Sequence, residues 1–200
     1  MAPFSVLHLC MGNICRSPIA ERLTVLAARN LVGDKADELL HVHSAGTGGW
    51  HVGEPMYPSA SRLVLSRGGS VDGFACRRLS PDDIESSDLI LTATAEQQRA
   101  VVSCRADAAG RTFVLGEFGR LLPSVALDDL PPFAPAEDAV YARGCALVAA
   151  VDALRGGLPP RPADDLDDPW GYPDETFARV ADEIEATVRP LVSALLPRRS

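Results

Sequence analysis

The sequence lacks any apolar run long enough to cross a membrane. Among the best candidates is Cys145–Leu154, which is short and is interrupted by Asp152, whereas a membrane-spanning helix needs about 20 apolar residues. The first residues also lack the basic stretch and the long apolar run of a secretory signal. We therefore expect no membrane partner.

Basic residues and cysteines are both in short supply. Nineteen basic residues stand against 27 acidic ones, which gives a net charge of −8 and argues against a general affinity for nucleic acid or anionic surfaces. The five cysteines are an odd number in a chain too large to need disulfide staples. These counts predict a reduced, cytoplasmic thiol protein in which a special cysteine has a chemical role.

The size and the apolar pattern of the chain predict one α/β domain. Its 200 residues, 46% hydrophobic and 23% charged, suffice for one buried core. Short apolar runs predict strands at 4–9, 41–44, 88–92 and 112–115. Helical spacing follows Pro18, covers Leu63–Arg67, and recurs over Phe177–Leu195, where Pro190 should kink or end the helix. This alternation predicts a single domain over residues 1–200, a four-stranded parallel sheet with helices on both faces.

Proline is concentrated in one part of the chain. Nine of the 16 prolines lie in 123–173, and proline cannot occupy a central strand. We therefore interpret about 121–165 as an insertion outside the sheet, with a helix over Ala136–Leu154. Three apolar side chains should dock that helix on the domain: Leu147, Val151 and Leu154.

The segment Cys10–Pro18 lies where the first strand meets the first helix. A loop that closes on a helix N-terminus directs several backbone N–H groups at one point, and the helix dipole adds positive potential there. Arg16 adds a planar charged fork for phosphate oxygens, and the same field favours the thiolate of Cys10 as a nucleophile. Gly12 and Asn13 tolerate the left-handed backbone of a tight loop. The pattern predicts a phosphate-binding loop.

The residues Leu9–Glu21 resemble the signature of the low-molecular-weight protein tyrosine phosphatases. Three further matches lie at Ser44-Ala45-Gly46-Thr47, at Trp50-His51-Val52-Gly53-Glu54-Pro55 and at Asp168-Pro169-Trp170. The resemblance covers about 4–118 and 165–190. It implies a phosphate loop between the first strand and the first helix, and hydrolysis of phosphotyrosine in proteins through a phosphocysteine, without metal or cofactor.

The resemblance also implies roles for the loop residues. Cys10 would attack the phosphorus, and Arg16 and the loop amides would stabilise the phosphate oxygens. Ser17 would hydrogen-bond the thiolate, and Asn13, supported by Ser44, would hold the strained backbone of the loop. The residues expected to bind substrate are Met11, Gly12, Asn13, Ile14, Cys15, Ser17, Trp50 and Trp170.

The general acid implied by the resemblance is Asp168. It would protonate the leaving oxygen and then accept a proton from water. Its neighbour Asp167 is the rival, and Asp168 is preferred because it directly precedes Pro169. The second arm of the predicted insertion ends close to this acid in sequence, so the insertion should lie near the acid loop in space.

Some residues depart from the family pattern, and two other activities remain open. Phe74 stands where many members have histidine, and Thr92-Ala93-Thr94 replaces a common Ala-Met-Asp. An arsenate reductase of the same fold would need two more cysteines, near Thr94 and Val101, and neither position is cysteine. Protein-arginine phosphatases of this family carry threonine in place of Ile14, whose apolar side chain favours an aryl phosphate. The oligomeric state stays open.

Overall fold

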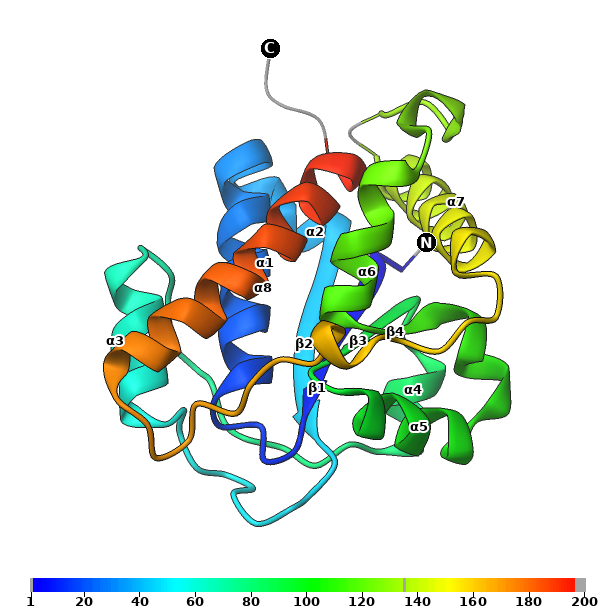
Figure 1. Ribbon diagram of the computed structural model, residues 1–200. Coiled ribbons are helices and arrows are strands. Elements are labelled where there is room, and N and C mark those ends of the chain that lie inside the picture. The colour runs from blue at the N-terminus through cyan, green and yellow to red at the C-terminus, as the bar shows by residue number, and fades with distance from the viewer. Residues whose placement is uncertain (1, 135, 197–200) are drawn as a thin grey trace.

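A four-stranded parallel sheet forms the centre of the computed structural model, which describes residues 2–134 and 136–196. Its strands are β1 (Phe4–Cys10), β2 (Leu40–Gly46), β3 (Leu89–Thr92) and β4 (Thr112–Val114), in the order β2-β1-β3-β4. This confirms the predicted sheet, except that Asp88, expected in the third strand, lies just before it and Leu115, expected in the last strand, begins a helix. The parallel strands run in the same direction, and the loops that follow β1 and β2 lie together at the bottom of the molecule in Figure 1.

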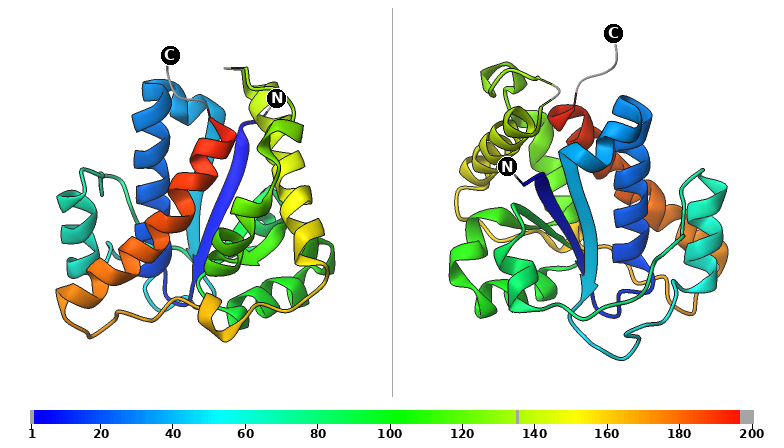
Figure 2. Two further views of the ribbon diagram at one scale, coloured as in Figure 1. Left: turned by 45° about the horizontal axis from the view of Figure 1, so that its top comes forward. Right: turned by 180° about the vertical axis from the view of Figure 1, so that it is seen from behind.

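Helices cover both faces of the sheet, as predicted (Figures 1 and 2). Alternate residues of a strand point to opposite faces, and both sets are buried here. Phe4 and Val6 of β1 belong to the large core under α1 (Arg16–Val32) and α8 (Asp174–Leu195). Leu7 and Leu9 belong to a smaller core that includes Ile84 and Val101, from α4 (Pro81–Glu85) and α5 (Ala95–Cys104).

Shorter helices complete the domain. They are α2 (Ala36–Leu39), α3 (Pro58–Ser66), α6 (Leu115–Leu121) and the 3-10 turns η1 (Gly33–Lys35), η2 (Ala106–Arg111), η3 (Leu122–Ser124), η4 (Leu127–Asp129) and η5 (Pro162–Asp164). The helix expected over Leu63–Arg67 is α3, which begins earlier because Pro58 is well placed in a first helical turn. In the described ranges no helix is long and apolar enough to span a membrane.

The sequence predicted that Pro190 would either kink the C-terminal helix α8 or end it, and the helix does not end there. The helix continues through the proline to Leu195. Proline deprives the carbonyl four residues earlier, that of Ala186, of its helical partner. Because Pro190 and Ala186 are both exposed, water can solvate that carbonyl, while the opposite stripe of apolar side chains stays buried.

The proline-rich segment lies outside the sheet, as predicted, and carries the helix α7 (Glu137–Arg155). Gly144 packs on Phe4 so closely that a Cβ would lie 2.4 Å from the ring. The prediction that Leu154 docks this helix is wrong, since Leu154 is 45% exposed. Its place is taken by Arg155, whose guanidinium lies over the Phe113 ring and donates to two backbone carbonyls.

Candidate active site

The loop between β1 and α1 forms the predicted anion cradle. Four of its carbonyl oxygens bond to groups outside the loop: Cys10 to Thr47 N, Met11 to Gly48 N, Asn13 to Cys76 Sγ, and Ile14 to Tyr57 N. In a trans peptide the N–H points opposite to the carbonyl, so the N–H groups that follow these carbonyls point into the loop. They belong to Met11, Gly12, Ile14 and Cys15. The helix α1 begins at Arg16, directly after the cradle.

Asn13 holds the strained position in this loop. Its φ is 57°, and it is the one non-glycine residue with a positive φ among the described residues. Its Nδ2 donates to the hydroxyls of Ser17 at 3.0 Å and Ser44 at 2.8 Å, and its Oδ1 accepts from the backbone N–H of Arg77 at 2.9 Å. The side chain thus bonds to three separate elements, which offsets the cost of the left-handed backbone.

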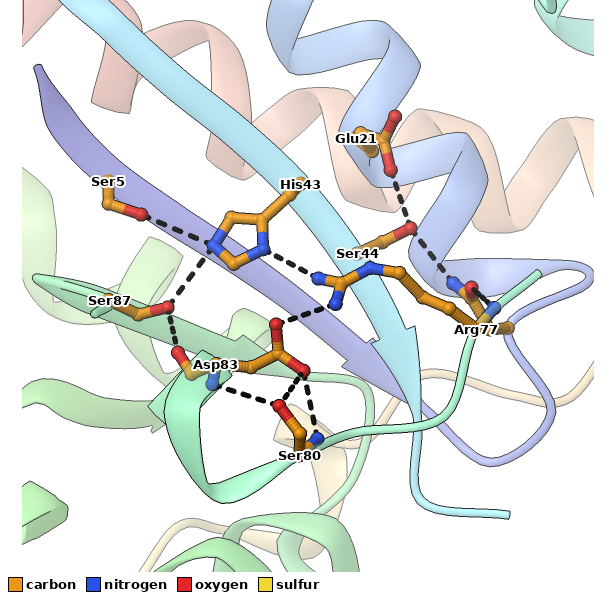
Figure 3. A network of polar contacts seen from close by, with 9 residues as sticks. Ser5, Glu21, His43, Ser44, Arg77, Ser80, Asp83 and Ser87 are labelled. Carbon is orange, nitrogen blue, oxygen red and sulfur yellow. Dashed lines mark hydrogen bonds and ion pairs between the residues drawn. The ribbon is translucent and has the colours of Figure 1, made fainter. Parts of the chain in front are cut away.

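The polar network around Asn13 extends to residues that sequence reasoning assigned no role (Figure 3). The Ser44 hydroxyl donates to Glu21 at 2.6 Å, and burial is the main cause that raises the pKa of Glu21. The Arg77 side chain donates to Asp83 at 2.6 Å and to Nδ1 of His43 at 2.7 Å. Burial lowers the pKa of His43 to about 4, so the ring is neutral and can accept this bond. Glu21 lies inside the segment Leu9–Glu21 that resembles the family signature, whereas Arg77 lies outside the motifs that carry the resemblance.

Cys10 lies at the floor of the loop. Its Sγ is 3.0 Å from the hydroxyl of Ser17, and the residue is only 3% exposed. Two more thiols lie near it. Burial is the main cause that raises the pKa of Cys15 far above its usual value and the pKa of Cys76 to about 11. Both are therefore protonated near neutral pH. Cys10, at the floor of the loop beside the Ser17 hydroxyl, is the candidate nucleophile.

Arg16 and Asp168 meet although 152 residues separate them in the chain. Nη2 of Arg16 donates to Oδ2 of Asp168 at 2.8 Å, and Nη1 donates to the carbonyl of Leu166 at 3.1 Å. The third nitrogen, Nε, is buried and has no partner in the part of the chain that the structure describes. Asp167 instead pairs with Arg179 at the surface. The geometry therefore places Asp168, and not Asp167, beside the phosphate loop.

A cavity of about 190 Å³ opens above Cys10. Its lining is Cys10, Met11, Gly12, Ile14, Cys15, Arg16, Trp50, His51, Asp168 and Trp170. Trp50 and Trp170 are 72% and 59% exposed, so both stand at the rim and neither belongs to the core. The predicted residues Asn13, Ser17 and Ser44 lie beneath the loop and do not line the cavity. The lining includes His51, which sequence reasoning left without a role; its Nδ1 lies 2.8 Å from Glu54.

Comparisons with known proteins agree with this geometry. The chain is 41% identical over 95 residues to low molecular weight protein-tyrosine-phosphatase YfkJ of Bacillus subtilis, and the match covers 46% of this chain and 57% of YfkJ. It is 35% identical over 114 residues to Etp of Escherichia coli, a protein of the same description, with 57% of this chain and 70% of Etp covered.

Solved structures show the same fold at low sequence identity. A protein tyrosine phosphatase from Entamoeba histolytica has a TM-score of 0.67 at 20% identity, over 94% of each chain. The YwlE arginine phosphatase from Geobacillus stearothermophilus has a TM-score of 0.63 at 21% identity, over 96% of this chain and 92% of the other.

The family model for low molecular weight phosphotyrosine protein phosphatase matches residues 5–150. This range contains the phosphate loop and the network beneath it, whereas Asp168 lies beyond it. The match covers well over half of the chain, and the chain belongs to the low molecular weight phosphotyrosine protein phosphatase family.

Proposed function

We propose that the protein is a protein-tyrosine-phosphatase that hydrolyses phosphotyrosine in proteins, and small aryl phosphates, through a phosphocysteine intermediate. The observation that carries the proposal is the meeting of a cysteine, an arginine and an aspartate at one cavity. Cys10 lies at its floor, and Arg16 and Asp168 are bonded to each other at its wall. The amides of the phosphate loop supply the remaining donors for phosphate oxygens.

In the first step the thiolate of Cys10 attacks the phosphorus, and the bond from phosphorus to the phenol oxygen breaks. Asp168 donates its proton to that oxygen, so the leaving group departs as a neutral phenol. The loop N–H groups and the Arg16 fork stabilise the equatorial oxygens of the transition state. Nε and Nη2 form one edge of the fork. Nε has no partner among the residues that the structure describes, and Nη2 must exchange Asp168 for phosphate.

In the second step a water molecule attacks the phosphocysteine. Asp168, now ionised, accepts a proton from this water, and the sulfur leaves as a thiolate. The hydroxyl of Ser17, 3.0 Å from Sγ, can donate to that thiolate and stabilise it. Inorganic phosphate is released, and the enzyme returns to its starting protonation state.

The walls of the cavity support an aromatic substrate. The rings of Trp50 and Trp170 stand at the rim, where they can pack on a phenyl ring. Ile14 places an apolar side chain in the cavity lining, which suits an aryl phosphate better than a phosphoguanidinium. We also propose that the protein acts in the cytoplasm, since a thiol nucleophile suits a reducing compartment.

The test is a comparison of substrates with the purified full chain. Peptides that carry phosphotyrosine, phosphoserine or phosphoarginine are incubated with the enzyme and released phosphate is measured, with arsenate reduction assayed in parallel. We expect release from phosphotyrosine only. Preferential release from phosphoarginine would instead identify a protein-arginine phosphatase, and arsenate reduction without phosphate release would identify a reductase.

A further inference from the structure

The segment that carries Asp168 is fixed to the domain at its root. Figure 1 shows the chain between α7 and α8 crossing the molecule at the ends of β1 and α6. There the N–H of Leu166 donates to the carbonyl of Ala93 at 2.8 Å. One residue earlier, Oδ1 of Asp165 accepts from the N–H of Ala95 at 2.7 Å. The segment is thereby held at the turn between β3 and α5.

An ion pair between the partly exposed Arg120 and the buried Asp164 adds a second attachment, to α6. Arg120 donates through Nε at 3.0 Å and Nη2 at 2.8 Å to the two carboxylate oxygens of Asp164, whose side chain is 5% exposed. Such a two-bond pair fixes orientation as well as distance. The carboxylate also accepts from the N–H of Arg161 at 2.7 Å. Although burial acts to raise the pKa of Asp164, these hydrogen bonds outweigh it, and its pKa lies below the usual value.

The helix α6 is itself tied to the sheet. It begins directly after β4, and Glu117 in its first turn accepts from the N–H of Val114 and from Nε2 of Gln98. Gly116, one turn before Arg120, touches the segment as well, because a Cβ there would lie 2.5 Å from the carbonyl oxygen of Asp164. Two points on one face of α6 therefore hold the root of the acid segment.

The consequence of this attachment reaches the phosphate loop. Leu166 lies two residues after Asp164, and its carbonyl accepts from Nη1 of Arg16. Two residues further, Asp168 accepts from Nη2 of the same guanidinium. Both contacts that orient the Arg16 fork thus come from the segment that Asp164 anchors.

We infer that Asp164 and Arg120 are positioning residues for the reaction: their ion pair holds the acid segment so that Asp168 reaches the leaving oxygen and Arg16 is aligned. The inference rests on the proposed phosphatase activity. Neither residue lines the cavity, so both act through others. The positioning role also connects the predicted insertion to the reaction, because Asp164 lies at the end of the insertion and Arg120 lies directly before its beginning.

The test compares aryl phosphates whose leaving groups differ in their need for a proton. We would measure kcat/KM, which covers the steps up to the phosphocysteine, for phenyl phosphate and for p-nitrophenyl phosphate. Asp164→Asn should lower the value for phenyl phosphate about tenfold more than that for p-nitrophenyl phosphate, a part of the 10²–10⁴-fold that general acid catalysis contributes. Arg120→Gln, at a partly exposed side chain, should shift the ratio in the same direction.

The matched control is Asp107→Asn. Asp107 accepts two bonds from Arg105 at 3.0 and 3.1 Å, but this pair lies at the surface. The control should leave the ratio of the two substrates unchanged. A loss of folded protein lowers the apparent kcat/KM of both substrates by the same factor, so it cannot change the ratio of the two values.

Two outcomes overturn different claims. If the wild-type protein hydrolyses neither aryl phosphate, the proposed function fails. If the wild type is active but the ratio for Asp164→Asn and for Arg120→Gln equals that of the wild type, the positioning role fails and the phosphatase proposal stands.

Discussion

Replacing Asn13 tests whether the phosphate loop is strained and held by side-chain bonds. Asn13→Ala removes three hydrogen bonds, to Ser17, Ser44 and the backbone of Arg77, and leaves a Cβ at a φ of 57°. Asn13→Gly removes the same three bonds but has no Cβ. In the folded state, the two variants therefore differ only in the backbone strain at residue 13.

The magnitudes follow from the contacts. Each hydrogen bond contributes about 1 kcal/mol, and the groups left unpaired in a buried site raise the loss. We expect Asn13→Ala to lower the free energy of unfolding by about 3–5 kcal/mol, within the stability of an ordinary domain. Asn13→Gly should be about 0.5 kcal/mol less destabilised, because glycine avoids a steric cost of about 1–2 kcal/mol but gives the unfolded chain about 0.4–1 kcal/mol more conformational entropy. Turnover should fall about 100-fold in both variants, since misplaced loop amides lose the transition-state oxygens.

Urea unfolding and p-nitrophenyl phosphate turnover provide the two measurements. Asn30→Ala is the matched control, because Asn30 is the other asparagine of the chain and is exposed on α1. It should change neither quantity by a measurable amount. A larger loss of unfolding free energy in Asn13→Gly than in Asn13→Ala would refute the backbone strain at residue 13. A loss below 1 kcal/mol in both variants would refute the contribution of the three hydrogen bonds.

Three further predictions concern other residues. Cys10→Ser should abolish turnover yet still bind inorganic phosphate, measured by calorimetry, because the cradle consists of backbone amides and an arginine; residual turnover near wild type would contradict the mechanism. Asp168→Asn should slow phenyl phosphate far more than p-nitrophenyl phosphate, and finding this pattern in Asp167→Asn instead would reassign the acid. Burial lowers the pKa of His8 to about 3; its contribution to stability is therefore complete above its ordinary value near 6.5 and is lost as the pH falls from there toward 3. In this range the free energy of unfolding should change with pH by up to about 1.4 kcal/mol per pH unit. Urea unfolding at several pH values should show a weaker pH dependence in His8→Phe, and an equal pH dependence in both proteins would refute the lowered pKa of His8.

Much of the fold follows from local patterns in the sequence. Leu7 and Leu9 alternate with Val6 along a strand that is apolar on both sides, and such a strand is typical of a covered parallel sheet. The segment Cys10–Pro18 is similarly local, because a loop that enters a helix carries its own donors. The helix in the proline-rich segment was also predictable, but the direction of Leu154 was not, since the packing of its last turn depends on Phe113 in the distant β4.

The sequence by itself predicted the four strands and the phosphate loop and proposed Cys10 as the nucleophile, because an apolar run and a loop that enters a helix are patterns of residues that are neighbours in the chain. Only the tertiary structure placed Asp168 beside Arg16, Arg77 under Asn13, and Asp164 against Arg120. These contacts join residues that are 44 to 152 positions apart. No local pattern encodes such pairs, since their meeting depends on how α6, the chain before α4 and the chain after α7 pack at the carboxyl end of the sheet.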